Sequence, residues 1–148
     1  MSRAAGRLLR VLGALCILAQ AGKAHAQQAA DSSRSTRSGV YSPDQASRGA
    51  EIYALSCASC HTAATHTGPA FAAKWAGLTL AELYEFIRGA MPKNDPGSLS
   101  AREYLLAMTY LLQMNGMPAG ANPLPSDSTA LGRIRIDFGA GRDTTPKR

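Results

Sequence analysis

The chain lacks a long hydrophobic run. Its most apolar stretch, residues 11–21, is too short to cross a bilayer as a helix, which takes about 20 apolar residues. Three arginines precede this stretch, and an Ala-His-Ala sequence ending at Ala26 follows it in the pattern of a signal-peptidase site. We therefore interpret residues 1–26 as a secretory signal peptide, with an uncleaved anchor as the alternative. We expect no stable membrane span after cleavage.

A basic face is also missing from the part of the chain that is expected to fold. The whole sequence has 16 lysines and arginines against 10 aspartates and glutamates, a formal net charge of +6. Four of the basic residues lie within residues 1–26, whereas residues 41–117 carry slightly more acidic than basic groups. Nucleic-acid binding needs basic side chains that cluster on the folded domain. We therefore expect no nucleic-acid partner.

Cysteine is scarce, and only Cys57 and Cys60 lie outside the predicted signal peptide. A structural zinc site needs four nitrogen or sulfur ligands, and here these cysteines, His61 and His66 would all have to come from ten residues. A thioredoxin-like dithiol opens a helix after a buried strand, but this pair ends a helical pattern. A simple disulfide would leave His61 without a role. Zinc, dithiol and disulfide chemistry are therefore the weaker alternatives for this site.

The sequence Cys57-Ala58-Ser59-Cys60-His61 has the spacing of a c-type haem attachment site. In that chemistry the two thiols add across the porphyrin vinyl groups and form thioether bonds. The histidine that follows becomes the proximal ligand of the iron. The two small residues between the cysteines let the ring approach the backbone closely. We therefore predict one covalently attached haem c whose iron is bound by His61.

Three helices are predicted from capping signals and apolar periodicity. Ser42, Thr79 and Ser100 each stand three residues before a glutamine or glutamate, which is the pattern of a capping box. Apolar residues then recur with the helical spacing i, i+3, i+4, i+7. The predicted helices begin at residues 43, 80 and 101 and end near residues 57, 89 and 115. The fold class is therefore all-α, with three to four helices wrapped round one covalent haem.

The first predicted helix has Gly49 on its apolar face and Cys57 at its end. A glycine inside a helix costs about 1 kcal/mol relative to alanine, so its presence on the packing face needs a reason. A second helix that crosses closely at this point is such a reason, and the third helix, which is apolar on most of its circumference, is the expected partner.

Met91 is the best candidate for the sixth iron ligand. Pro92 disfavours a helical conformation at Met91, which places it on an extended turn beyond a full helix. A thioether ligand raises the reduction potential of haem iron. We expect Met108 to pack in the core and His66 to face solvent. The remaining candidates are Met114, Met117 and Lys93.

Residues 62–77 are predicted to form a loop with two supporting roles. A proximal imidazole usually donates its second N–H to a carbonyl, and Gly68-Pro69 is a plausible source of that carbonyl. Trp75 would cover the haem and hydrogen-bond a propionate through its indole N–H, with an ordinary core tryptophan as an equally weighted alternative.

These features together resemble a class I, monohaem cytochrome c over residues 42–120. The resemblance implies that Cys57 and Cys60 attach the haem, that His61 and Met91 bind the iron, and that Pro69 orients His61. The segment from residue 91 to residue 116 is more closely similar to cytochrome subunits or domains associated with bacterial quinoprotein (PQQ) dehydrogenases, which implies a redox partner. The loop that carries His66 and the long C-terminal region depart from the family pattern.

The domain organisation follows from composition. We expect residues 27–40 to be a disordered leader because they lack an apolar period, and residues 41–117 to be the cytochrome c domain. Residues 118–148 are expected to be an extended C-terminal tail. Its alternating segment, residues 134–138, predicts a short strand that lies along the domain or a partner without joining the core.

The predicted function is electron transport in the periplasm, and the chain is not expected to be an enzyme. No acid, base or substrate pocket is evident beside the iron. The expected electron donor is a periplasmic dehydrogenase, and the expected acceptor is an oxidase or another cytochrome. The alternatives are an obligate cytochrome subunit of a dehydrogenase complex and a haem sensor or catalytic haem with a labile distal ligand. A dithiol oxidoreductase is the alternative without haem.

Overall fold

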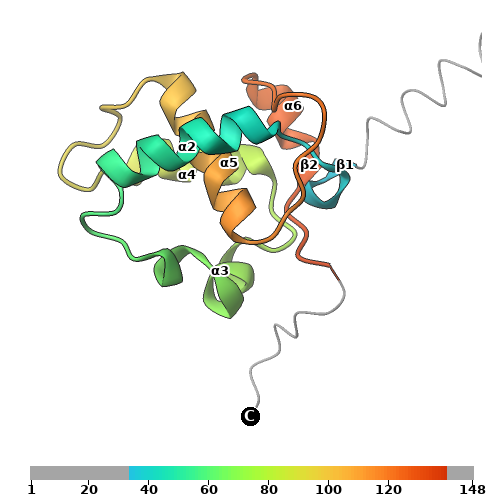
Figure 1. The fold of residues 1–148 in the computed structure, drawn as a ribbon, viewed down its shortest axis with the longest axis horizontal. Coiled ribbons are helices and arrows are strands. Elements are labelled where there is room, and N and C mark those ends of the chain that lie inside the picture. Colours follow the sequence, from blue (N-terminus) through green and yellow to red (C-terminus); the bar gives the residue numbers. More distant parts are fainter. Residues whose placement is uncertain (1–33, 140–148) are drawn as a thin grey trace, which may run out of the picture. The chain divides into compact units, whose positions relative to one another are not determined.

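The computed structural model describes residues 34–139 (Figure 1). The chain divides into two units after Ser33, and every described residue lies in the second. The predicted signal peptide, part of the predicted leader (residues 27–33) and the end of the predicted tail (residues 140–148) lie outside the described residues. Among the residues that are described, no helix combines the length and the apolar character needed to cross a membrane.

Helices dominate the described part, which confirms the all-α fold class. In chain order, the elements are β1 (Arg34–Ser35), η1 (Thr36–Ser38), α2 (Pro43–Ser56), η2 (Ala63–His66), α3 (Gly68–Trp75), α4 (Leu80–Ala90), α5 (Ala101–Met114), α6 (Ser128–Gly132) and β2 (Ile134–Arg135). Two of the α-helices were not expected. The predicted loop of residues 62–77 contains α3, because Pro69 suits the first turn of a helix. The predicted tail contains α6.

All three predicted capping boxes are present. Ser42, Thr79 and Ser100 accept a hydrogen bond from the backbone N–H three residues later, and the side chain of that later residue accepts one from the cap. Each reciprocal pair satisfies two N–H groups that a helix start would otherwise leave unpaired. The helices α2, α4 and α5 therefore begin where local sequence chemistry places them.

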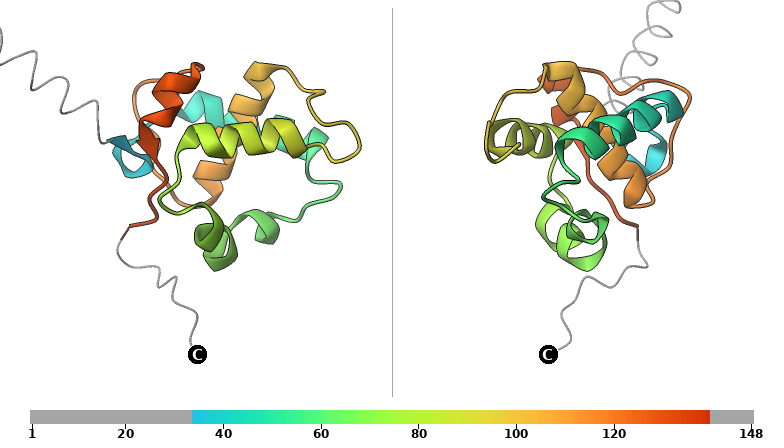
Figure 2. Two further views of the ribbon diagram at one scale, coloured as in Figure 1. Left: turned by 180° about the vertical axis from the view of Figure 1, so that it is seen from behind. Right: turned by 60° about the vertical axis from the view of Figure 1, so that its left-hand side comes forward.

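Helix α2 crosses α5 at Gly49, as its place on the apolar face predicts (Figures 1 and 2). A Cβ atom built on Gly49 would overlap the Leu106 carbonyl oxygen and lie 2.8 Å from its carbon. It would also lie 3.0 Å from the Cβ of Tyr110. The two helix backbones therefore approach too closely for any side chain. This contact fixes the helix that ends at Cys57 against the most buried helix.

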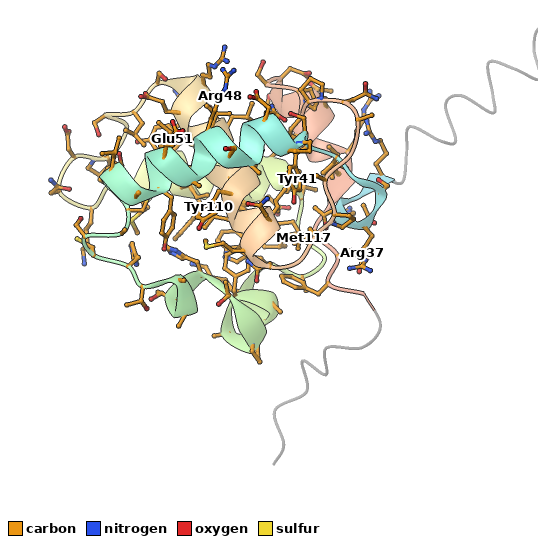
Figure 3. All side chains as sticks on the ribbon, in the orientation of Figure 1. Arg37, Tyr41, Arg48, Glu51, Tyr110 and Met117 are labelled. Carbon is orange, nitrogen blue, oxygen red and sulfur yellow. The ribbon has the colours of Figure 1, made fainter. Side chains whose placement is uncertain are left out.

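The core lies between α2, α4, α5 and the chain segments that flank them. Figure 3 shows Arg48 and Glu51 on the outer side of α2 and Tyr110 beneath it. The buried Tyr41 hydroxyl donates a hydrogen bond of 2.6 Å to the carbonyl of Met117, which ties the start of α2 to the segment after α5 (Figure 3).

The packed unit is larger than the predicted domain of residues 41–117. Strand β1 pairs in parallel with β2, with Arg34 opposite Ile134, although residue 34 was expected in a disordered leader. The Thr36 hydroxyl donates a hydrogen bond to the Asp137 carbonyl at 3.2 Å and accepts one from the Asp137 N–H at 2.9 Å. The predicted leader and the predicted tail are therefore joined to each other.

The expectation that the C-terminal region stays outside the core is also wrong. Residues 124–138, here termed the C-terminal strap, place five apolar side chains in the core, and these are Leu124, Leu131, Ile134, Ile136 and Phe138. The predicted alternation is correct, since Ile134 and Ile136 are buried and Arg135 is exposed. The apolar face packs on this domain itself because α4 presents Leu80 and Leu83, which need cover.

Candidate functional site

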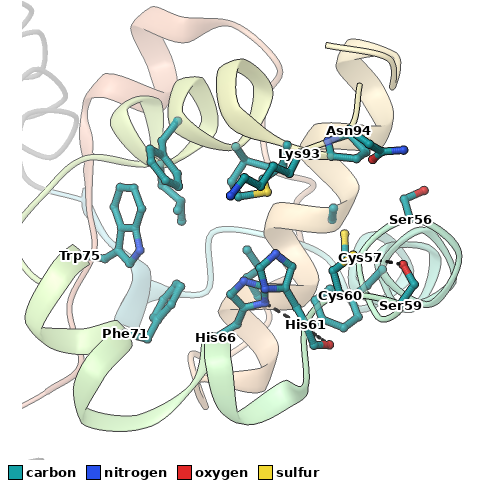
Figure 4. A pocket seen from close by; sticks show the side chains of 18 residues that line it. Ser56, Cys57, Ser59, Cys60, His61, His66, Phe71, Trp75, Lys93 and Asn94 are labelled. Atoms are coloured by element: carbon teal, nitrogen blue, oxygen red, sulfur yellow. Dashed lines mark hydrogen bonds between the residues drawn. The ribbon is translucent and has the colours of Figure 1, made fainter. Parts of the chain in front are cut away.

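A single pocket brings most of the predicted site residues together (Figure 4). Its empty volume, counted together with the open solvent at its mouth, is about 780 Å³. Its lining comes from α2, η2, α3, α4, α5 and the turns between them. The lining residues are Tyr53, Ser56, Cys57, Ser59, Cys60, His61, His66, Phe71, Trp75, Leu83, Phe86, Ile87, Met91, Pro92, Lys93, Asn94, Ala107 and Leu111.

The end of α2 places both cysteines and the adjacent histidine on this pocket. Cys57 caps the helix, and its N–H donates to the carbonyl of Tyr53 at 2.9 Å. The N–H groups of Cys60 and His61 both donate to the Cys57 carbonyl, at 3.1 and 3.0 Å, so the chain turns tightly. Both cysteines are free thiols. Burial raises the pKa of Cys57, which keeps that sulfur protonated at neutral pH.

His66 lies beside His61 rather than facing solvent, contrary to expectation. It lines the pocket, and the centroids of the two imidazole rings are 4.5 Å apart. The Tyr53 hydroxyl contacts Nδ1 of His66 at 3.1 Å and the His61 carbonyl at 3.4 Å. Asn115 donates to the His66 carbonyl at 2.8 Å. No local sequence signal indicates this position, because the contacts come from α2 and the end of α5.

These contacts have consequences for protonation. Burial, followed by the neighbouring His61, lowers the pKa of His66 and so favours a neutral ring. Burial raises the pKa of Tyr53, which therefore keeps its proton at neutral pH. A carbonyl can only accept, so when Tyr53 donates to His61, His66 must supply its Nδ1 proton to Tyr53. Beside the His61 carbonyl, the pocket thus holds the neutral side chains of Tyr53 and His66, each of which donates a hydrogen bond in this arrangement.

Met91 and its neighbours form another wall. Met91 caps the C-terminus of α4 in an extended conformation, with φ −132° and ψ 152°, as the following proline predicts. In Figure 4, Lys93 and Asn94 lie across the pocket from His61. Met108 is fully buried in the core, as expected, and Met117 is also a core residue. Of the predicted alternative ligands, His66 and Lys93 line the pocket.

Aromatic side chains close the end of the pocket away from the cysteines (Figure 4). Trp75 is buried, with Phe71 and Phe86 at centroid distances of 6.3 and 5.2 Å. The Lys74 ammonium lies 3.8 Å from the centre of the Phe86 ring, a cation–π contact. Trp75 thus belongs both to the core and to the pocket wall. Phe71 also contacts Phe138, so the C-terminal strap supports this wall.

Pro69 is the predicted site residue that does not line the pocket. It is exposed in the first turn of α3. Among the described residues, the structure shows no hydrogen bond from the His61 ring to the carbonyl of Gly68 or Pro69. The role of Pro69 in orienting His61 therefore stays a prediction.

Comparison with known families identifies the kind of domain that contains this pocket. Residues 44–111 match the family model described as cytochrome C oxidase, cbb3-type, subunit III. These residues form a monohaem cytochrome c domain. Searches of curated proteins and of solved structures found no match. The match ends at residue 111, so the C-terminal strap lies outside the cytochrome c domain that the family model defines.

A cytochrome c domain implies a covalently attached haem c, and the side chains of this pocket fit one. Two free thiols are available for the thioether bonds, and an imidazole and a thioether are available for the iron. The rest of the lining is mainly aliphatic and aromatic, which suits a porphyrin face. His61 and Met91 both line the pocket, so both are available to hold the iron.

Proposed function

We propose that this chain is an exported one-electron carrier with a single haem c. Cys57 and Cys60 attach the haem, His61 and Met91 bind its iron, and Trp75 covers one edge. The observation that carries the proposal is that the Cys57–His61 motif meets Trp75 and Met91, which lie farther along the chain, on one largely apolar pocket of a cytochrome c domain.

The chemistry follows from what these side chains do. When bound, haem supplies a reversible Fe(III)/Fe(II) couple. The Met91 thioether is a soft ligand that favours Fe(II), so it raises the reduction potential. The apolar walls exclude water, which also favours Fe(II) over the more highly charged Fe(III). Ligands held in both oxidation states need little rearrangement, which suits transfer of a single electron.

The lining also supports a carrier over an enzyme. None of the described residues that line the pocket carries a carboxylate. His66 is the nearest candidate for acid–base chemistry, but it lies against His61 and is already bonded to Tyr53. A haem sensor or catalytic haem needs an open or labile distal side, so it remains the second candidate, with ligand binding as the discriminating property.

The location and the partners extend this proposal. The predicted signal peptide supports a periplasmic location. The matched family is named for a subunit of cbb3-type cytochrome c oxidase, which supports an oxidase as electron acceptor. A quinoprotein dehydrogenase as donor rests on the resemblance of residues 91–116. An obligate subunit that docks through its tail is less well supported, because the C-terminal strap packs on its own domain.

The test uses full-length protein matured with haem in a bacterial periplasm. We expect a c-type reduced-minus-oxidised spectrum and, in the ferric state, the weak far-red band of His/Met ligation. Met91→Ala should abolish that band, lower the potential and let CO bind the ferrous protein readily. Met114→Ala is the matched control, since Met114 is partly buried on α5 and does not line the pocket. Rapid CO binding by the wild type would favour the sensor alternative.

A further inference from the structure

The segment that carries Met91 is an exposed connection between α4 and α5. Residues 93–98 are all exposed, and only Met91, Pro92 and Leu99 within residues 91–99 are partly buried. Its internal hydrogen bonds are two short turns, from the N–H of Asp95 to Pro92 and from that of Ser98 to Asp95. Side-chain packing therefore does little to fix the part of this segment that follows Pro92.

The hydroxyl group of one buried tyrosine, Tyr104, hydrogen-bonds the backbone of this segment. Tyr104 lies in the first turns of α5 and is 1% exposed. Its hydroxyl donates to the Met91 carbonyl at 2.7 Å and accepts from the N–H of Gly97 at 3.0 Å. A longer contact of 3.5 Å reaches the N–H of Leu99. A phenol has one proton to donate and two positions to accept, so this segment uses the whole hydrogen-bonding capacity of Tyr104.

These bonds fix the backbone of Met91 on both sides. Its N–H donates to the carbonyl of Ile87 at 2.9 Å, and its carbonyl accepts from Tyr104. Tyr104 belongs to α5, and α5 packs against α2 at Gly49. The same rigid helix pair therefore carries the anchor of the Met91 segment and, at the end of α2, Cys57.

We propose that Tyr104 is a positioning residue that holds Met91 on the iron. Tyr104 does not line the pocket and acts through the backbone of residues 91–99. This inference rests on the proposed function, in which Met91 is the distal ligand. Without the hydroxyl, the segment loses three bonds at once, and the Met91 sulfur leaves the iron more often.

The test compares Tyr104→Phe with Tyr84→Phe in the haem-loaded, full-length protein. Tyr84 is also buried, and its hydroxyl donates to the carbonyl of Ala101 at 3.2 Å, outside the Met91 segment. Both variants lose a buried phenol hydroxyl, but only the first releases Met91. We expect Tyr104→Phe to speed CO binding to the ferrous protein about tenfold or more and to weaken the ferric far-red band. Tyr84→Phe should leave both close to wild type.

Equal CO-binding rates in Tyr104→Phe, Tyr84→Phe and wild type would overturn the inference and leave the proposed function intact. If the wild type itself lacks the far-red band and binds CO as fast as Met91→Ala, the ligand assignment fails, and the inference with it.

A second measurement covers a Tyr104→Phe variant that does not mature. Because coupling between sites is reciprocal, loss of the iron–sulfur bond in Met91→Ala should weaken the hydrogen-exchange protection of the Gly97 amide. Protection of Gly97 that is absent in the wild type, or unchanged in Met91→Ala, would also overturn the inference.

Discussion

Replacing Gly49 with alanine tests the helix crossing on which the site depends. Alanine improves helix propensity by about 1 kcal/mol, whereas overpacking in a close contact costs about 1–3 kcal/mol and occasionally more. The obstacle is the Leu106 carbonyl, whose carbon would lie 2.8 Å from the new Cβ. Backbone atoms cannot rotate away, so we expect the upper part of that range and a net loss of about 2 kcal/mol.

The assay is thermal and urea unfolding of the ferric holoprotein. A loss of about 2 kcal/mol corresponds to a fall of roughly 10 °C in Tm for a domain of this size. Gly89→Ala is the matched control, because Gly89 also lies within a helix but has open space around its Cβ position. It should gain up to about 1 kcal/mol from propensity alone. If Gly49→Ala is as stable as wild type, or is stabilised as Gly89→Ala is expected to be, the close crossing is refuted.

Two further predictions concern the helix starts and the strap. Hydrogen bonds from Thr79 and from Ser100 lower the pKa of Glu82 and Glu103 below the usual 4.5. The two ionised carboxylates therefore contribute to stability above that pH, and this contribution is lost as the pH falls through the lowered pKa values. The double variant Glu82→Gln/Glu103→Gln should therefore lose less unfolding free energy than wild type between neutral pH and acid, and an identical pH dependence would contradict this. Leu131→Ala, at a fully buried strap position, should cost about 2–5 kcal/mol in urea unfolding, whereas the exposed Leu55→Ala should stay within about 0.5 kcal/mol. A strap variant as stable as wild type would show that residues beyond the family match do not support the core.

The helix starts, the thiol–imidazole site and the conformation of Met91 could all be predicted from short stretches of sequence. A capping box needs only residues three apart, and Pro92 acts on its direct neighbour. Gly49 predicts a close crossing because a glycine on an apolar helix face weakens the helix, and a nearby backbone that leaves no room for a side chain accounts for that cost. The capping residues and Pro92 act within about one helical turn of their own positions, whereas Gly49 signals locally that a partner is needed without naming it.

Only the tertiary structure decided where the ends of the chain go and which groups surround the predicted ligands. The alternation at residues 134–138 predicts a strand, but its partner, Arg34–Ser35, lies a hundred residues away. His66 reaches the pocket because Tyr53 and Asn115 hold it there, and Tyr104 reaches Met91 because α5 packs against α4. The need of an apolar face for cover, or of a buried hydroxyl group for a hydrogen-bond partner, can be read from nearby residues. The partner itself comes from a distant part of the chain and cannot. The sequence therefore determined the chemistry of the site, whereas the packing of distant segments decided what supports it.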